Sequence, residues 1–278
     1  MTARNAPAEH DTARLQRSSG TGRLSVVHLD AETRLKTLYQ QGCARLRLPR
    51  HRGRHGLEAV MINTAGGMTG GDELAWSFEA GPGTALSVTT QASEKIYRSA
   101  GAAAKITVTI RAGAGSRLSW LPQETILFDR GALERRITAH LDGQSEALFV
   151  EPVVFGRTAM REEVVTGSLR DRWRLFVDGK AVHAEEFAIA GRIADRLKAG
   201  AVAGGDHAFA TVLLISPRAE ALVTDARRLI GDAGGASAWS GKLLIRLVAA
   251  NGYELRRRLV PVIGLLEPQT PLPKLWTL

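Results

Sequence analysis

The sequence predicts a mainly β protein, an elongated β-helix-like stack of repeated strands with two helices near the C-terminus. Between residue 24 and about residue 216, apolar and polar residues alternate in short runs separated by glycine-containing turns, which is typical of stacked β architectures. One stretch of the chain repeats at an offset of 32 residues. After residue 216 the apolar residues change to the helical period of about 3.6.

The N-terminal residues differ from the rest of the chain. Residues 1–23 contain no apolar block and mix both signs of charge, so we expect a disordered tail without a secretory signal. We expect order to begin at Leu24 and a single β-rich domain to span residues 24–278.

The strand predictions depend on alternation of apolar and polar side chains. In Lys105–Arg111 the side chains of Ile106, Val108 and Ile110 alternate with polar ones, so one face of this strand lies in a core and the other in water. Residues 73–79 follow the same pattern. Further predicted strands are residues 24–29, 44–48, 58–63, 86–91, 117–121, 135–141, 147–155, 169–177, 181–189 and 242–249, and residues 209–215 form an apolar run.

An internal repeat favours a stack over a closed barrel. Ala80–Gln91 aligns with Ala112–Gln123 at the offset of 32, with six of twelve positions identical. A fainter third copy begins near Asp142, at an offset of 30 from the second. Units that each repeat a turn and a strand bury their apolar faces on one another, which is how a layered β architecture grows.

Two helices are predicted in the C-terminal part of the chain. Residues 218–231 begin after a proline, carry an apolar stripe and end at Gly231. Residues 253–266 have apolar residues at helical spacing, although Pro261 should kink or interrupt that helix.

Composition excludes several classes of protein. Lys and Arg number 37 against 28 Asp and Glu, a formal net charge of +9, and the single cysteine, Cys43, can form neither an internal disulfide nor a thiolate zinc site. A reducing, cytoplasmic location is therefore expected. No apolar run is long enough to cross a membrane. The basic segment 45–55 lacks the aromatic residues that single-strand binding needs, so we expect no nucleic-acid partner.

Familiar catalytic motifs are missing from the sequence. The segment ending at Gly241 and Lys242 has the wrong glycine spacing for a phosphate-binding loop, and the glycine-rich Gly66–Asp72 is a turn between strands that opens no helix. The nucleophile-elbow and zinc-protease motifs do not occur. We expect no catalytic residues and no tightly bound cofactor.

Carboxylates at strand edges are the remaining chemical signal. Such oxygen ligands suit weak, transient binding of a divalent ion. The alternative is pairing with a cation, for example Glu94 with Lys95 or Arg98. The carboxylates at strand edges are Asp72, Glu94, Glu124, Asp129 and Glu151.

Four segments together resemble the urease accessory protein D family, called H in some bacteria. They are N-T-A-G-G-M-T-G-G-D at 63–72, T-T-Q-A-S-E-K-I-Y-R at 89–98, W-L-P-Q-E-T-I-L-F-D at 120–129 and F-G-R-T-A-M at 155–160. The closing L-P-K-L-W also resembles the ending of that family.

The resemblance implies a non-enzymatic scaffold for nickel insertion. Such a chain would join an F-type accessory protein and a G-type GTPase to apo-urease; GTP and magnesium would bind only to the GTPase, and nickel would pass transiently. On this hypothesis the metal path is lined or braced by Asp72, Glu94, Glu124 and Asp129, with Thr89, Thr90 and Gln91 as polar lining.

The same hypothesis assigns the surplus of positive charge to protein docking. Arg170, Arg172 and Arg174 lie on one face of a predicted strand, where we expect an acidic partner to bind. The main alternative function is a β-helix polysaccharide-cleaving enzyme, which would share the repetitive stack and the paired carboxylates.

Overall fold

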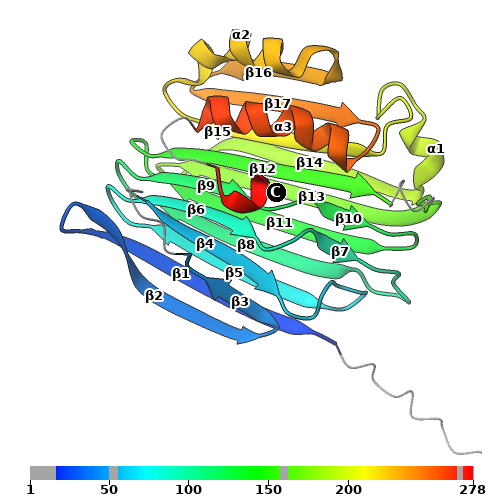
Figure 1. The fold of residues 1–278 in the computed structure, drawn as a ribbon, viewed down its shortest axis with the longest axis horizontal. Coiled ribbons are helices and arrows are strands. Elements are labelled where there is room, and N and C mark those ends of the chain that lie inside the picture. Colours follow the sequence, from blue (N-terminus) through cyan, green and yellow to red (C-terminus); the bar gives the residue numbers. More distant parts are fainter. Residues whose placement is uncertain (1–16, 50–55, 157–161, 268–271, 278) are drawn as a thin grey trace, which may run out of the picture.

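A computed structural model describes residues 17–49, 56–156, 162–267 and 272–277. It confirms the predicted fold class, a mainly β stack with few helices (Figure 1). The strands form two large sheets that face each other.

Sheet A has seven strands. Across the sheet they are β14 (Lys180–Arg192), β13 (Thr166–Val177), β11 (Ala132–Leu141), β8 (Ala104–Ala112), β5 (Glu73–Ala80), β1 (Ser19–Leu29) and β2 (Glu32–Gly42). The five strands from β13 to β1 are parallel, while β14 and β2 pair antiparallel at the two edges.

Sheet B has a main path of eight strands and a short branch. The main path is β16 (Gly234–Trp239), β17 (Lys242–Ala249), β15 (Ala208–Ile215), β12 (Glu146–Phe155), β9 (Arg117–Leu121), β6 (Ala85–Thr90), β4 (Leu57–Asn63) and β3 (Ala44–Arg47). The branch runs from β12 through β10 (Thr125–Leu127) to β7 (Glu94–Ile96).

The pairing registers confirm the repeat of 32 residues. Leu86 lies opposite Leu118 between β6 and β9, and Glu73 lies opposite Lys105 between β5 and β8, so both sheets advance by one unit at this offset. The third copy was misaligned by one residue, because β12 places Ala147, not Leu148, opposite Leu118. A shift of one residue turns a side chain to the other face, and Leu148 accordingly packs away from sheet A.

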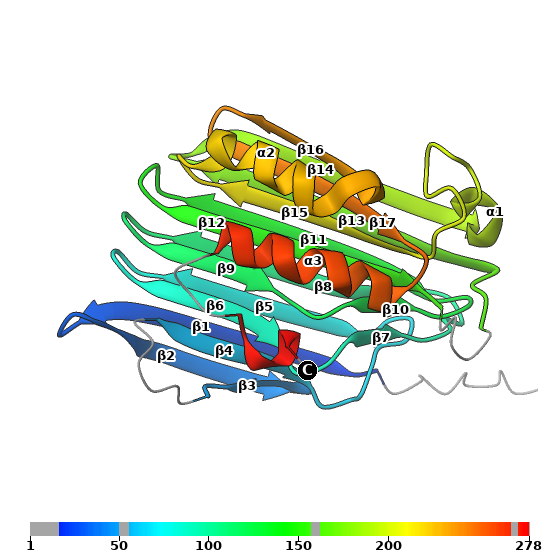
Figure 2. The same cartoon turned by 45° about the horizontal axis from the view of Figure 1, so that its top comes forward.

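Two apolar cores result from this arrangement. One lies between the sheets, and the second lies between sheet B and the helices α2 (Ala219–Ile230) and α3 (Gly252–Leu266). Figure 2 shows both helices lying across this face of sheet B. Both helix predictions are confirmed, but α3 runs through Pro261 without interruption. Pro261 has no N–H to donate to the backbone carbonyl of Arg257, but both residues face solvent.

Two N-terminal predictions need correction. β1 begins at Ser19, five residues before the expected start at Leu24, because its first half pairs with β2 and β5 although its apolar content is low. β2 was not predicted at all, since nearly all its side chains are exposed and leave no one-sided pattern. Residues 1–16 of the predicted tail lie outside the described residues.

Smaller elements complete the described chain. They are α1 (Ile193–Leu197) and two short 3-10 helices, η2 (Gly231–Ala233) and η3 (Lys274–Trp276). The predicted turn over residues 66–72 joins β4 to β5 and so carries the chain from sheet B to sheet A. Gly67 has φ of +149°, and a Cβ there would come within 2.4 Å of the Tyr97 ring. None of the described helices is long and apolar enough to cross a membrane.

Candidate functional site

A buried ionic cluster lies in the core between the two sheets. Arg135 projects inward from β11 and forms ion pairs with Glu151 of β12 and with Asp171 of β13, the latter at 2.6 Å between Nη2 and Oδ2. The three residues are only 4%, 2% and 6% exposed, respectively. A guanidinium between two carboxylates is the arrangement that makes so deep a burial of charge tolerable.

Neighbouring polar side chains hold these carboxylates in place. The indole of Trp120 donates to Oε1 of Glu151 at 2.7 Å, and the indole of Trp173 donates to Oδ1 of Asp171 at 3.0 Å. Arg135 also donates to the hydroxyl of Thr125 at 3.1 Å. The cluster is therefore held by hydrogen bonds from both sheets and the branch strand β10.

The cluster continues along the branch strands. Thr125 lies directly opposite Glu94 of β7, so their side chains share a face, and Asn63 at the end of β4 donates to Oε1 of Glu94 at 3.0 Å. We call this set the interior polar row. Its members, from one end to the other, are Asn63, Glu94, Thr125, Arg135, Glu151 and Asp171.

The two glutamates of the row, Glu94 and Glu151, have raised pKa values. Burial raises the pKa of Glu94 to about 7, against smaller opposing effects of Asn63 and Lys95. Burial likewise raises the pKa of Glu151 to about 7, although the Arg135 guanidinium opposes the shift. Two of the three carboxyl groups, Glu151 and Asp171, pair with the Arg135 guanidinium, and Glu94 pairs with Asn63, so the row carries excess negative charge when fully ionised.

Some buried polar atoms at and near the row have no hydrogen-bond partner within the described chain. They include Nε of Arg135 and Nε2 of Gln123. Buried polar groups of this kind are usually satisfied by ordered water or an ion. Both atoms are N–H donors, so ordered water is the partner that would satisfy them.

The predicted metal residues are placed unequally. Glu94 belongs to the interior polar row, and its backbone N–H donates to the carbonyl of Glu124 at 3.0 Å, so these two residues are neighbours. The Glu124 side chain pairs with Arg256 of α3 at 3.1 Å and accepts from Ser93 at 3.2 Å. Glu124 thus shows the cation pairing considered as the alternative.

The two aspartates of the predicted set fasten loops. Asp72 accepts the backbone N–H groups of Ser18 and Thr69, each at 2.8 Å, and Asp129 accepts that of Thr166 at 2.9 Å. Neither aspartate meets the interior polar row through a contact in the described chain. Within the described ranges, no group of three or more His, Cys, Asp or Glu side chains could hold a metal ion.

The predicted polar lining does not form one surface. Thr89 is fully buried on the helix side of sheet B, since its neighbour Val88 belongs to the core between the sheets. Its hydroxyl has no partner among the described residues. Thr90 accepts the backbone N–H of Gln123 at 2.8 Å, and Gln91 is exposed.

The predicted docking arginines lie on the outer face of sheet A. Arg170 donates to Glu186 of β14 at 2.8 Å, and Arg174 approaches the same carboxylate at 3.5 Å. The hydrogen bond from Arg170 lowers the pKa of Glu186. The side chain of Arg172 is half-buried between them. Glu186 therefore partly neutralises the positive charge of these three arginines.

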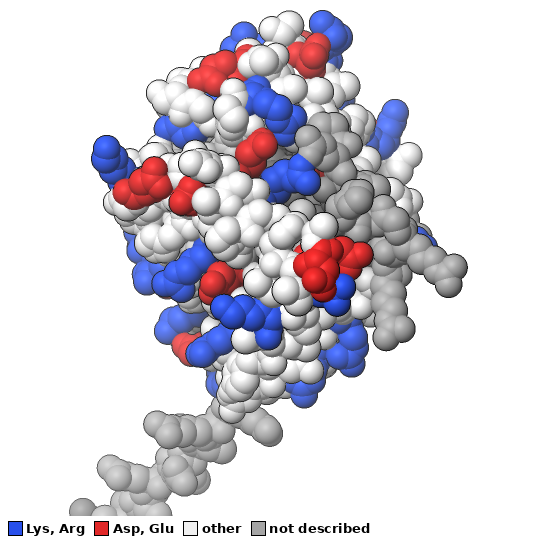
Figure 3. All heavy atoms as spheres, turned by 90° about the vertical axis from the view of Figure 1, so that its left-hand side faces the viewer, with Lys and Arg blue, Asp and Glu red and all other residues white. Residues whose placement is uncertain are grey.

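Charge is mixed on the side of the stack that forms the left of Figure 1. Figure 3 shows basic and acidic side chains interspersed on this face. Most of the basic segment 45–55 lies outside the described residues.

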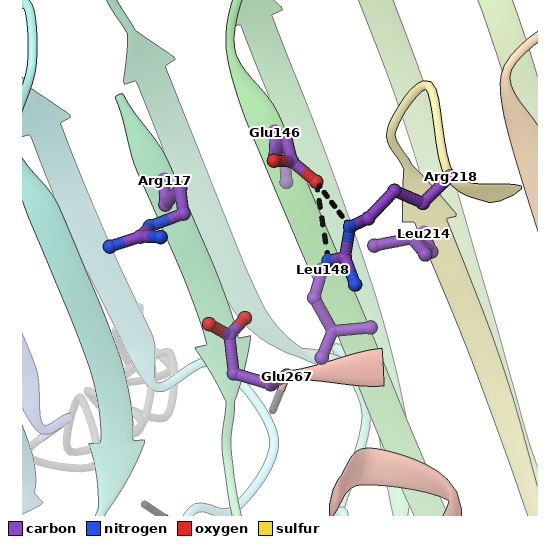
Figure 4. A pocket seen from close by; sticks show the side chains of 7 residues that line it. Arg117, Glu146, Leu148, Leu214, Arg218 and Glu267 are labelled. Carbon is purple, nitrogen blue, oxygen red and sulfur yellow. Dashed lines mark hydrogen bonds and ion pairs between the residues drawn. The ribbon is translucent and has the colours of Figure 1, made fainter. Parts of the chain in front are cut away.

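A small pocket beside the C-terminal end of α3 has a structural role. Glu146 pairs with Arg218 at 3.3 Å, as the dashed lines in Figure 4 mark. Glu267, which follows the last residue of α3, accepts from Ser119 at 2.7 Å. Arg218 also donates to the carbonyl of Leu266 at 3.3 Å. The pocket has a volume of about 10 Å³, which holds at most one water molecule. The contacts that line it therefore serve to anchor α3 on sheet B.

Sequence reasoning missed the centre of the site. Arg135 and Asp171 were placed on strands without a role, and Glu151 was noted only as an edge carboxylate. The signal was present in the alternation: Arg135 stands at an inward position between Leu133 and Ile137, and Asp171 stands between Leu169 and Trp173. A charge at an inward position must find a buried partner.

Fold and site together define a two-sheet β-solenoid with an ionisable interior and a helical cover on one sheet. The model of the family described as UreD urease accessory protein matches residues 18–277. The chain belongs to the UreD urease accessory protein family.

Several curated relatives cover almost the whole chain. The urease accessory protein UreD of Rhizobium leguminosarum bv. viciae is 50% identical over 268 residues, covering 96% of this chain and 98% of the relative. That of Agrobacterium fabrum is 48% identical, covering 95% and 93%. Urease accessory protein UreD 1 of Brucella abortus biovar 1 is 47% identical and covers 95% of each chain.

Proposed function

We propose that this chain is a non-enzymatic urease maturation factor that carries nickel through its interior to apo-urease. The relatives' name, urease accessory protein, supports the coarse role. The observation that supports the nickel path is the interior polar row, in which three carboxyl groups and one guanidinium lie between two apolar sheet faces. An interior that lacked a polar cargo would gain stability from apolar residues at these positions.

The chemistry of the row suits passage and release. Nickel passes over the carboxylates of Glu94 and Glu151 and the hydroxyl of Thr125, which are oxygen ligands that bind a borderline ion weakly. Protons compete with the ion, since both carboxyl groups have pKa values near 7. Several shallow binding positions in series let an ion leave, whereas one deep position would retain it.

The remaining predicted residues take supporting positions in this proposal. Asp72 and Asp129 brace the mouth of the path by fixing the loops that they cap. Glu124 lies beside the row through its contact with the Glu94 backbone; Thr89 and Thr90 end strand β6, and Gln91 follows directly after it.

Partners follow from the same proposal. The chain joins an F-type accessory protein and a G-type GTPase to apo-urease in the cytoplasm, and GTP and magnesium bind only to the GTPase. Arg170, Arg172 and Arg174 meet an acidic partner surface, and added salt should then weaken the complex.

Charge-neutral substitutions in the path test the proposal. Glu94→Gln, Glu124→Gln and Glu151→Gln keep shape but remove a negative charge, so each should lower the nickel content of activated urease at least threefold. The measurement is nickel per urease after co-expression with all accessory proteins, alongside size-exclusion of the accessory complex. Glu79→Gln, on the exposed outer face of β5, is the matched control.

Two outcomes would overturn the proposal. Full nickel loading of urease with all three variants would show that nickel does not pass along these carboxylates. Loss of loading together with loss of the complex would show that these residues act in assembly and not in nickel passage.

A further inference from the structure

The two sheets end unevenly at the side of the molecule away from β2. Sheet A ends at β14, whereas sheet B continues past β15 with β17 and β16 (Figure 1). One face of β17 packs on α2 and α3, and the other face presents Leu244, Arg246 and Val248, which are half-buried or exposed. In the described chain, no strand of sheet A follows β14 to cover this face.

A cavity of about 600 Å³ opens at this overhang. Its base is formed by three aromatic rings in contact, Phe155, Phe209 and Phe187, whose centroids are 5.9 and 4.5 Å apart in that order. Val202, which is 47% exposed, and Arg196 of α1 lie at its rim. An apolar base with cations at the rim is typical of a binding site for an apolar group that carries negative charge nearby.

β14 also presents a free main-chain edge. Its thirteen residues pair only with β13 among the described strands. On the sheet B side, the Val182 carbonyl accepts from Nζ of Lys242 at 2.6 Å, and Glu185 pairs with Arg246 at 2.6 Å. These two contacts fix the separation between β14 and β17. A long unpaired edge beside an apolar cavity is a template for strand addition.

We propose that an extended segment of a partner protein, with alternating apolar and acidic residues, adds to β14 as a further strand of sheet A. Its apolar side chains enter the cavity over Phe187, and its acidic side chains meet Arg196 and Arg246. The segment continues sheet A over the part of β17 that lines the cavity, at Arg246 and Val248.

The charges of β14 argue against a second copy of this chain as the occupant. Antiparallel pairing of two β14 strands over their full length, about a two-fold axis at Glu186, would place Lys180 opposite Arg192 at both ends and Glu186 opposite itself at the centre. Like charges directly opposite each other destabilise a strand pair. An acidic segment would instead meet Lys180 and Arg196, and it would share Arg192 with Asp195 and Arg246 with Glu185.

The inference rests on the proposed function only in taking the chain to have protein partners. The cavity and the interior polar row share no residue. Failure of the nickel path would leave strand addition at β14 untouched, and failure of strand addition would leave the nickel path untouched.

Two synthetic peptides and hydrogen exchange test the proposal on the full chain. The first is a capped ten-residue peptide that alternates Glu with Val or Phe; the second replaces every Glu with Lys. The acidic peptide should bind at least tenfold more tightly by fluorescence anisotropy. It should also protect backbone amides within residues 180–192 from exchange, because strand addition forms new main-chain hydrogen bonds there.

Substitutions at the rim of the cavity distinguish binding at this site from nonspecific electrostatic attraction. Val202→Asp and Arg196→Glu should each lower the affinity for the acidic peptide at least tenfold. The matched controls Val165→Asp and Arg111→Glu change exposed residues outside the cavity and should leave affinity unchanged.

Three results would overturn the proposal. They are equal binding of the two peptides, protection that appears on β2 in place of β14, and protection of β14 by self-association without peptide. The last result would assign the edge to a second copy.

Discussion

At the scale of single residues, the molecule depends on the balance of charge around Arg135. Its guanidinium is the shared partner of Glu151 and Asp171, and tryptophan donors from both sheets complete the carboxylate hydrogen bonds. Each partner is tolerable only while the others are present, because an unpaired buried charge costs several kcal/mol.

Removal of the Arg135 charge should destabilise the fold strongly. Arg135→Met keeps most of the side-chain volume but leaves two buried carboxyl groups without their cation. We expect the free energy of unfolding to fall by about 3–5 kcal/mol in urea denaturation. Arg136→Met, on the exposed face of the same strand, should change it by less than about 0.5 kcal/mol. Equal effects of the two substitutions would contradict the role of the cluster.

The raised pKa of Glu94 predicts a pH dependence of stability. An acid whose folded pKa lies above its unfolded value of 4.5 contributes stability below that value, and the contribution is lost as pH rises to about 7. Glu94→Gln should therefore raise the free energy of unfolding by about 1–3 kcal/mol at pH 8 and leave it unchanged at pH 4.5. A constant difference between wild type and variant across this range would refute the assignment.

The alternation of apolar and polar residues allowed part of this site to be predicted from the sequence, but not the rest. Glu94 and Glu124 could be selected as carboxylates at strand edges. Arg135 and Asp171 have side chains at inward positions of sheet A, and their partner Glu151 comes from sheet B. Which strand of sheet B faces which strand of sheet A depends on the rung-by-rung stacking, which a period-two pattern does not specify.

At the scale of elements, the helical cover of sheet B is held at its ends. Asn251 caps α3 by accepting from the backbone N–H of Glu254 at 3.0 Å, and η3 places Trp276 in the second core. The Trp276 indole donates to the carbonyl of Leu121 at 2.9 Å, and Arg256 of α3 lies over its ring at 5.1 Å. The short C-terminal segment thus joins α3 to β9.

Truncation of Trp276 should loosen this cover. Trp276→Ala removes a large side chain that is 1% exposed and leaves the Leu121 carbonyl without its donor, so we expect a loss of about 3–5 kcal/mol in the free energy of unfolding. Trp239→Ala, at a ring that is 40% exposed, should cost less than half as much. A similar loss in both variants would show that Trp276 does not anchor the segment.

Elements with a one-sided apolar pattern could be predicted from sequence, and those without it could not. β5, β8 and both long helices bury one face and were found close to their observed bounds. β2 exposes both faces and exists through its ladder with β1. Pro261 did not break α3 because the lost hydrogen bond lies on the solvent side.

At the scale of the whole molecule, a repeated unit builds two sheets with a mostly apolar space between them, and the interior polar row crosses that space. The row spans strands of successive units, from β4 to β13. A stack can therefore carry polar groups from one rung to the next without opening its core to solvent along its length. The proposed cargo moves along this row.

The location of bound nickel tests the central claim most directly. Crystals of the chain with its accessory partners, soaked in nickel, can be examined by anomalous scattering at the nickel absorption edge. Passage through the interior predicts partly occupied peaks between the sheets beside the carboxylates of Glu94 and Glu151. Peaks confined to surface histidines, with none between the sheets, would contradict it.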